Sequence, residues 1–377
     1  MWNLHYLKHL DFRMLLIIIG LMMVSLCTIS STTAQIYAQT DDQFLTPFVK
    51  SQILWFGIGM CAYLFLSGFH YHKLRKWAWA FYIVAIILLI GLFFTEKVRN
   101  AHRWYRFPLF QVMIQPSDYA KLVVVLLLSR FLEKREGRAG GWKTLLQASA
   151  IVVIPFALIL KQPDLGSAFV LLFISYGLFY VGGIHPLCMR ISFFISLGLL
   201  FLVFCIFLGV FPQDSFQRAA GFFLKEYQYD RLNARTYHHQ AAKIAIGLGK
   251  YRGSGWRKGE FIGRKFLPAG HTDSVFPAFA EEFGVLGVLL LLLLFLGMIH
   301  YGFQVTSVAR DPFGRFLSAG ITLYLATHVL INVGMMCGLI PITGIPLPLI
   351  SYGGSSILST MSALGILQSV YTKRFVF

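Results

Sequence analysis

Residues 266–301 read FLPAGHTDSVFPAFAEEFGVLGVLLLLLLFLGMIHY, and this stretch decides the fold class. From residue 275 onward it is long and apolar enough for a helix to cross the roughly 30 Å hydrocarbon core of a bilayer, which takes about 20 residues. A lone acid, Asp273, stands immediately before that span. An ionisable group beside hydrocarbon is costly unless it is paired, solvated or used, so its position predicts a partner and a function.

The composition of the whole chain indicates a membrane protein. Of its 377 residues, 57% are hydrophobic and 13% are charged, and the mean hydropathy is +0.67. These values exclude a soluble globular domain. We predict an all-α, polytopic integral membrane protein with about ten transmembrane helices in a single domain, residues 1–377. The predicted spans are 12–30, 49–68, 77–94, 117–132, 143–160, 165–182, 187–211, 275–301, 315–337 and 347–371.

The arrangement of basic residues predicts the orientation of these spans. Short connections rich in Lys and Arg, such as 73–76 and 130–143, are typical of the cytoplasmic side, so both termini are predicted to be cytoplasmic. One large extracytoplasmic loop, residues 212–274, then separates the seventh and eighth helices. Five cysteines, most of them inside predicted spans, indicate neither a disulfide framework nor a structural zinc site.

The formal net charge of +17 has two readings. Cytoplasmic flanks account for part of the excess through topology and anionic lipid headgroups. The basic residues of the outer face either solvate the loops or gather an anionic substrate such as a pyrophosphate, and the sequence leaves both open. Nucleic acid is disfavoured as a partner because the basic groups share a face with membrane helices instead of forming a soluble basic domain.

Two outer segments share a Gln-Pro-acid pattern in front of an apolar span. The first, Gln115-Pro-Ser117-Asp118, places the proline in the first helical turn and the acid near the positive end of the helix, with Lys121 on the same face. Taken alone, helix capping and an i,i+3 ion pair explain it better than chemistry. The second ends at Asp164. Two such helices could direct their acids into one shared polar cavity, with Lys121 as counter-charge, whose role alone would be structural.

Trp104 and Arg103 precede the first of these segments. Trp104 by itself is more typical of an interfacial belt than of a ligand contact.

Asp273 has a competing structural reading, in which Thr272 or Asp273 only caps the following helix. A metal ion on His271 is disfavoured because no second histidine lies at ligand spacing nearby. Glu281 and Glu282 fall about two turns into the predicted helix and must face protein or a cavity. This group of acids is larger than capping requires.

The last loop, 332–356, is broken by proline and glycine at membrane depth, which is tolerated only where protein or water covers the backbone. Ser351, Gly353 and Gly354 are candidate ligand contacts, since backbone amides there could cradle an anion. Small residues for close helix packing are the alternative, which we favour slightly.

Taken in order, RWYRF, QPSDYAKL, KQPDLGSA, FLPAGHTDSVFPAFAEEFG and NVGMMCGLIPITGIPLPLISYGGSS resemble the SEDS (shape, elongation, division and sporulation) membrane proteins, and the form GIPLPLISYGGSS resembles the RodA branch. The resemblance implies a peptidoglycan glycosyltransferase of the inner (cytoplasmic) membrane that joins lipid II disaccharides during elongation, together with a class B penicillin-binding protein.

The resemblance also implies residue roles. The essential acid of the family's HTD motif falls on Asp273, the tryptophan of its RW motif on Trp104, and its QPDLG acid on Asp164. Asp118 and Lys121 match the acid and lysine of its QPSE motif, with Asp in place of the usual Glu. Ala269, Gly270 and Ser274 also depart from the usual residues around HTD, as do Phe107 and Pro108 after RW.

A glycosyl transfer with inversion needs one base for the acceptor hydroxyl and positive charge for the departing pyrophosphate. We predict Asp273 as the base, with basic side chains of the 212–274 loop, and in addition a divalent cation (Mg²⁺ or Mn²⁺) if one binds, neutralising the leaving group. Two alternatives stay open: a transporter of lipid II, with the Asp118, Lys121 and Asp164 cavity as its path, or a noncatalytic scaffold.

Overall fold

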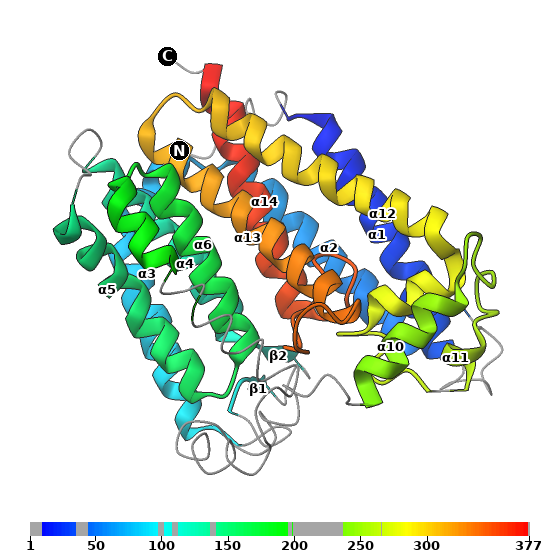
Figure 1. Ribbon diagram of the computed structural model, residues 1–377. Helices are drawn as coiled ribbons and strands as arrows, with labels where there is room; N and C mark the ends of the chain where they lie inside the picture. The colour runs from blue at the N-terminus through cyan, green and yellow to red at the C-terminus, as the bar shows by residue number, and fades with distance from the viewer. Residues whose placement is uncertain are drawn as a thin grey trace, which may run out of the picture.

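The computed structural model describes residues 10–34, 44–96, 102–107, 112–135, 141–194, 198, 237–264 and 266–375. The chain is mostly helical (Figure 1). Helices α3, α4, α5 and α6 form one side of the molecule, α1 and α12 form the other, and α2, α13 and α14 lie between them. The longer helices are α1 (Phe12–Ala34), α2 (Pro47–Gly68), α3 (Tyr71–Gly91), α4 (Pro116–Glu133), α5 (Trp142–Lys161), α6 (Leu165–Val181), α12 (Val275–Val308), α13 (Pro312–Met336) and α14 (Gly354–Thr372).

Within the described residues, 6 helices are long and apolar enough to cross a membrane: α1, α2, α3, α5, α12 and α13. Three shorter or more polar helices, α4, α6 and α14, also fall where spans were predicted. Helix α4 carries the buried charges Asp118 and Lys121, and α14 is rich in serine, which lowers their hydropathy without moving them out of the bundle. The chain is a multi-pass membrane protein. Most of the predicted span 187–211 lies outside the described residues.

The prediction of an all-α chain missed one small sheet. Strands β1 (Tyr105–Phe107) and β2 (Val112–Ile114) pair antiparallel, with Tyr105 opposite Ile114. This hairpin lies in the connection between α3 and α4, where the chain turns back on itself and its backbone groups pair with each other. The hydroxyl of Tyr105 donates to the carbonyl of Leu88 (2.9 Å) and so attaches the hairpin to the end of α3.

Helix α12 is broken, although the sequence predicts a continuous span. Gly284 has φ 62° and ψ −165°, a conformation that is essentially restricted to glycine. The backbone groups released at the break are bound by the preceding loop: the Val285 amide donates to the Lys250 carbonyl (2.9 Å), and the Ser254 amide donates to the Glu281 carbonyl (2.9 Å). The short first part, 275–283, is thus separate from the long part that follows.

The predicted loop 212–274 contains two further helices, α10 (Tyr237–Leu248) and α11 (Glu260–Gly263). Both lie at the end of the molecule where α12 begins (Figure 1). Residues 212–236 of that loop lie outside the described residues.

The last helix also starts later than expected. Residues 347–353 form turns, with Leu349 at φ 60°, and α14 begins at Gly354, so the predicted start at residue 347 is wrong. Pro346 and Pro348, just before and within this segment, lack the backbone N–H that a helix interior needs, which disfavours a helix there.

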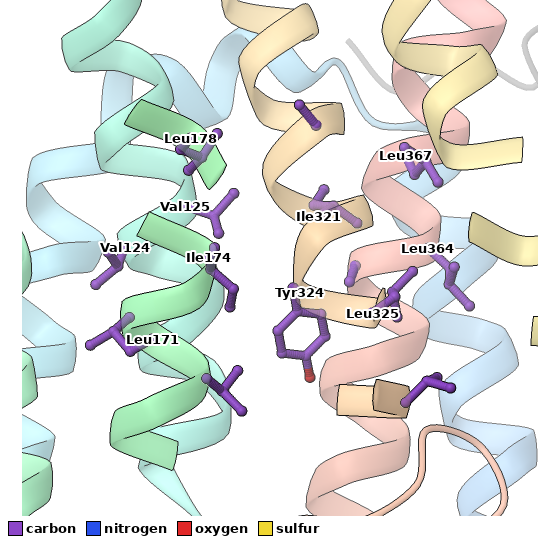
Figure 2. Packing of buried hydrophobic residues seen from close by; sticks show 14 of the residues in the cluster. Val124, Val125, Leu171, Ile174, Leu178, Ile321, Tyr324, Leu325, Leu364 and Leu367 are labelled. Atoms are coloured by element: carbon purple, nitrogen blue, oxygen red, sulfur yellow. The ribbon is translucent and has the colours of Figure 1, made fainter. Parts of the chain in front are cut away.

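Helix α13 is the centre of the core. Figure 2 shows Tyr324 of α13 on the side of Val125 of α4 and Ile174 of α6, and Leu325 on the side of α14. Because α13 touches both halves of the bundle, residues on it can connect groups that lie on different helices.

Candidate active site

Asp273 lies on a tight turn at the start of α12 and is half-buried. The turn is closed internally, because the amides of Thr272 and Ser274 both donate to the carbonyl of Ala269 (3.0 and 3.1 Å). Ala269 adopts φ 51°, the left-handed region that is unusual for a residue other than glycine. The unusual residue pair before HTD therefore sits in the turn that shapes this site.

Three successive carbonyls of the turn accept hydrogen bonds from the last part of the chain. The amide of Tyr352 donates to the His271 carbonyl (2.8 Å), and the Ser351 hydroxyl donates to the Thr272 carbonyl (2.7 Å). The Asn332 side-chain amide donates to the Asp273 carbonyl (3.2 Å). The backbone that carries Asp273 is thus fixed from α13 and from the loop before α14.

The N-cap position of α12 is taken by Ser274, and the Ser274 side chain makes no capping hydrogen bond. The Ser274 hydroxyl instead pairs with the His238 ring of α10 (2.6 Å). Asp273 is the residue before the cap.

The two Gln-Pro-acid segments come together, as the repeated pattern predicts. The Gln115 side-chain amide donates to Asp164 Oδ2 (3.1 Å) and the Ser117 hydroxyl approaches the same oxygen (3.4 Å). Arg103 donates to the Pro163 carbonyl and lies 3.9 Å from the Asp164 carboxylate. Asp164 also caps α6 by accepting from the Ser167 amide (3.4 Å). This cluster fixes the starts of α4 and α6 against each other.

Asp118 and Lys121 form a buried pair with a third member that the sequence did not indicate. Lys121 Nζ lies 2.9 Å from Asp118 Oδ1 and 3.1 Å from His328 Nε2 on α13. An ammonium group only donates, so His328 Nε2 is the acceptor and the ring is neutral. Lys121 is 1% exposed and Asp118 3%. Their charges are bound to each other and do not face an open surface.

Trp104 is half-buried and leads into β1, beside Arg103. Arg103 reaches the Gln-Pro turn that precedes α6. The RW motif therefore lies next to the Asp164 cluster.

Glu281 and Glu282 are buried, at 1% exposed each, and their carboxylates hold the preceding loop. Glu281 accepts from the amides of Phe261 (2.7 Å) and Ile262 (3.1 Å) in α11. Glu282 accepts from the Arg257 amide (2.9 Å) and from the Ser31 hydroxyl of α1. Both carboxylates were predicted to face protein or a cavity, and both contact protein groups.

Of the candidate residues in the last loop, Ser351 makes hydrogen bonds and Gly354 allows close helix packing. The Ser351 hydroxyl accepts from the Leu347 amide (2.8 Å) as well as binding the Asp273 turn. A Cβ on Gly354 would lie 2.1 Å from the ring of Trp55 on α2, whereas the nearest atom to a Cβ on Gly353 is 3.9 Å away. Close packing of α14 on α2 therefore explains Gly354.

Sequence reasoning missed Asn332, His328 and His238 as members of this region. A single polar residue in an apolar helix carries no local signal of its partner. The spacing of two of these residues was a signal, because His328 and Asn332 of α13 are four positions apart and so lie on one face of the helix. Among the described residues no group of three or more His, Cys, Asp or Glu side chains could hold a metal ion.

Known proteins resemble the chain over nearly its full length. Residues 9–375 match the family model described as "Cell cycle protein", which groups FtsW, RodA and SpoVE. The peptidoglycan glycosyltransferase MrdB of Escherichia coli (strain K12) is 32% identical over 367 residues, which cover 97% of this chain and 94% of MrdB. Stage V sporulation protein E of Bacillus subtilis (strain 168) is 33% identical over 363 residues, which cover 95% of this chain and 94% of that protein.

Solved structures share the fold. RodA of Thermus thermophilus superimposes with a TM-score of 0.70 at 24% identity, covering 98% of both chains. A chain from "Structural coordination of polymerization and crosslinking by a peptidoglycan synthase complex" gives a TM-score of 0.75 at 24% identity, covering 98% of this chain and 99% of that chain.

Proposed function

The chain belongs to the SEDS family of membrane proteins, which includes FtsW, RodA and SpoVE, and on this premise we propose that it is a peptidoglycan glycosyltransferase. It polymerises lipid II into glycan strands during cell-wall elongation, with Asp273 as the general base. Its relative MrdB is named for the same activity.

One observation carries the choice of Asp273. Of the five candidate acids, Asp118, Asp164, Glu281 and Glu282 are buried and their carboxylates bind protein groups, whereas Asp273 is only half-buried. Its turn is fixed through three carbonyls, which places the carboxylate on a rigid segment. A base needs this combination of access and fixed position.

The proposed reaction uses one carboxylate. The Asp273 carboxylate takes the proton of the acceptor hydroxyl as its oxygen attacks the anomeric carbon of the donor, and the bond to the lipid pyrophosphate breaks with inversion. Exposed basic side chains of the described loop, Lys250, Arg252, Lys258 and Arg264, supply positive charge near this end of the molecule for the leaving group.

A divalent cation, Mg²⁺ or Mn²⁺, could assist by neutralising the pyrophosphate together with Asp273 and the basic side chains of the loop. A rate that falls in a chelator and returns on addition of Mg²⁺ or Mn²⁺ supports a bound cation, and a rate that is unchanged in a chelator contradicts it.

We place the Asp273 end of the molecule outside the inner (cytoplasmic) membrane and both termini inside. Helix α1 begins and α14 ends at one end of the bundle, whereas the hairpin, α10 and α11 lie at the other (Figure 1). An even number of spans, about ten in one domain of residues 1–377, with the 212–274 loop between the seventh and eighth, fits this arrangement.

Lipid II is the proposed substrate, and a class B penicillin-binding protein that cross-links the strands is the proposed partner. One chain that shares the fold comes from a peptidoglycan synthase complex that coordinates polymerization and crosslinking.

A polymerisation assay with labelled lipid II tests these assignments. The purified chain is assayed alone and together with a class B penicillin-binding protein. Wild type is expected to give long glycan chains in at least one condition, and Asp273→Ala none. Glu260→Ala, which removes an exposed acid of the same loop, is the matched control and is expected to be active. Glycan chains made by the Asp273→Ala variant would refute the assignment of Asp273 as the base.

The two alternative functions give different products in the same experiment. A transporter moves lipid II across vesicles without forming chains, using the polar cluster of α4 and α6. A scaffold does neither and leaves Asp273 dispensable. If wild type forms no glycan chains under either condition, the assignment as a glycosyltransferase is overturned.

A further inference from the structure

We propose that Asn332 is a positioning residue for the reaction: it fixes the turn that carries Asp273 and connects this turn, through α13, to the buried Lys121–Asp118 pair. The proposal rests on the proposed role of Asp273 as the base. It assigns the buried ion pair to the support of the catalytic turn, not to contact with substrate.

The Asn332 side chain joins two segments that are distant in sequence. Its Nδ2 donates to the Asp273 carbonyl (3.2 Å) and to the Ile345 carbonyl in the loop before α14 (2.7 Å). Both hydrogens of the amide are thereby used. The residue is fully buried, so no water competes for these bonds.

The remaining atom of the same side chain shows that the orientation has a cost. Asn332 Oδ1 is buried and has no hydrogen-bond partner within the described ranges. An unsatisfied buried acceptor is unfavourable. Rotating the amide by half a turn would put Oδ1 against two carbonyl oxygens, which is worse. The two donated bonds therefore determine how this side chain is placed.

Helix α13 transmits the position of the ion pair to Asn332. His328 lies one helical turn earlier on the same face and accepts from Lys121, which is paired with Asp118 of α4. A helical turn is rigid, so the contact at His328 sets the depth and rotation of Asn332. The buried charges and the Asp273 turn are thus attached to α13 one helical turn apart.

A general base must lie within hydrogen-bond reach of the hydroxyl it deprotonates, and a displacement of about 1 Å can cost about 10²-fold in rate. Loss of the Asn332 bonds releases one of the three carbonyls that fix the turn. The effect should fall on the chemical step more than on substrate binding.

The kinetic test uses purified full-length chain with its penicillin-binding partner and lipid II in liposomes. Asn332→Leu keeps the side-chain volume and removes both donors; we expect kcat to fall about 10²-fold with KM changed by less than about 3-fold. Asn332→Asp keeps the shape and places an acceptor against two carbonyls, and it should be at least as impaired. Leu330→Ala, on the lipid-facing side of α13, is the control and should retain wild-type kcat.

Should Asn332→Leu fail to fold, Asn332→Gln retains both donors on a longer side chain and is expected to lose about 10-fold in kcat. Unchanged kcat in a folded variant, or a rise in KM alone, would overturn the proposal.

Hydrogen exchange gives a readout that does not depend on activity. In Asn332→Leu the amides of Thr272, Ser274 and Tyr352, all bonded within or to the turn, should exchange at least about 10-fold faster, while amides in the middle of α14 keep their rates. Unchanged exchange of these three amides would refute the positioning role. Polymerisation by an Asp273 variant would instead refute the base and leave the exchange result intact.

Discussion

At the scale of single residues, the environment of each acid decides its role. Glu281 and Glu282 bind backbone amides of the loop, Asp164 caps α6 and receives Gln115, and Asp118 pairs with Lys121. Four carboxylates are thus structural by their contacts. Asp273 differs because it is half-buried and lies on a turn whose backbone carbonyls are bound by neighbouring segments.

The buried ion pair gives a prediction for stability. Lys121→Met leaves the Asp118 carboxylate buried without its ammonium and should lower the free energy of unfolding by about 3–5 kcal/mol. The double variant Asp118→Leu/Lys121→Met removes both charges and should recover most of this loss. Thermal unfolding in detergent measures both. A double variant less stable than Lys121→Met would contradict the assignment of a paired, buried network.

Part of the site follows from sequence at this scale. The repeated Gln-Pro-acid pattern predicts that the two helix starts meet, and Gln115 and Ser117 do contact Asp164. The pattern did not indicate that Lys121, paired with Asp118, also contacts His328. The roles of Asn332 and His328 were not predictable, because a polar residue within an apolar helix gives no sign of which distant carbonyl or ammonium it meets.

At the scale of elements, breaks in helices create the site. Gly284 divides α12 and the loop 250–255 binds the released backbone groups, which leaves a short half-helix behind Asp273. A glycine in an apolar run is usually tolerated in a continuous helix, so the sequence did not reveal this break. The start of α14 was also placed too early, since apolar residues around prolines score as part of a span.

Adjacent glycines at the start of α14 give a matched pair of variants. Gly354→Ala places a methyl group 2.1 Å from the Trp55 ring and should lower the free energy of unfolding by about 1–3 kcal/mol. Gly353→Ala meets no atom nearer than 3.9 Å and should change it by less than about 0.5 kcal/mol. Equal effects of the two substitutions in thermal unfolding would contradict the close contact between α2 and α14.

At the scale of the whole molecule, the two ends of the bundle are fixed by different chemistry. The Asp273 end depends on buried hydrogen bonds and broken helices. At the opposite end, Asp311 caps α13 by accepting from the Gly314 amide (3.0 Å), and it also accepts from the Tyr71 hydroxyl and lies 3.4 Å from His72 of α3. This contact ties the α12–α13 connection to the start of α3.

The Asp311 contact predicts a dependence of stability on pH. Burial acts to raise the pKa of Asp311, but hydrogen bonds from His72, Tyr71 and the Gly314 amide outweigh it and lower the pKa to about 2 from 3.8. The stabilisation is therefore complete above about pH 4 and is lost as the pH falls through 2, by about 2 kcal/mol in total. Asp311→Asn should remove this part of the acid dependence in unfolding experiments, and an unchanged pH profile would contradict it.

The central claim concerns one carboxylate, Asp273, at the start of α12. Its most direct test is the initial rate of glycan polymerisation from lipid II by the purified chain together with a class B penicillin-binding protein, with wild type compared with Asp273→Asn. Because Asn keeps the shape of Asp but cannot accept a proton, the rate should fall about 10²–10⁴-fold while the unfolding temperature matches that of the Glu260→Gln control. A rate for Asp273→Asn within about 3-fold of wild type would contradict the claim.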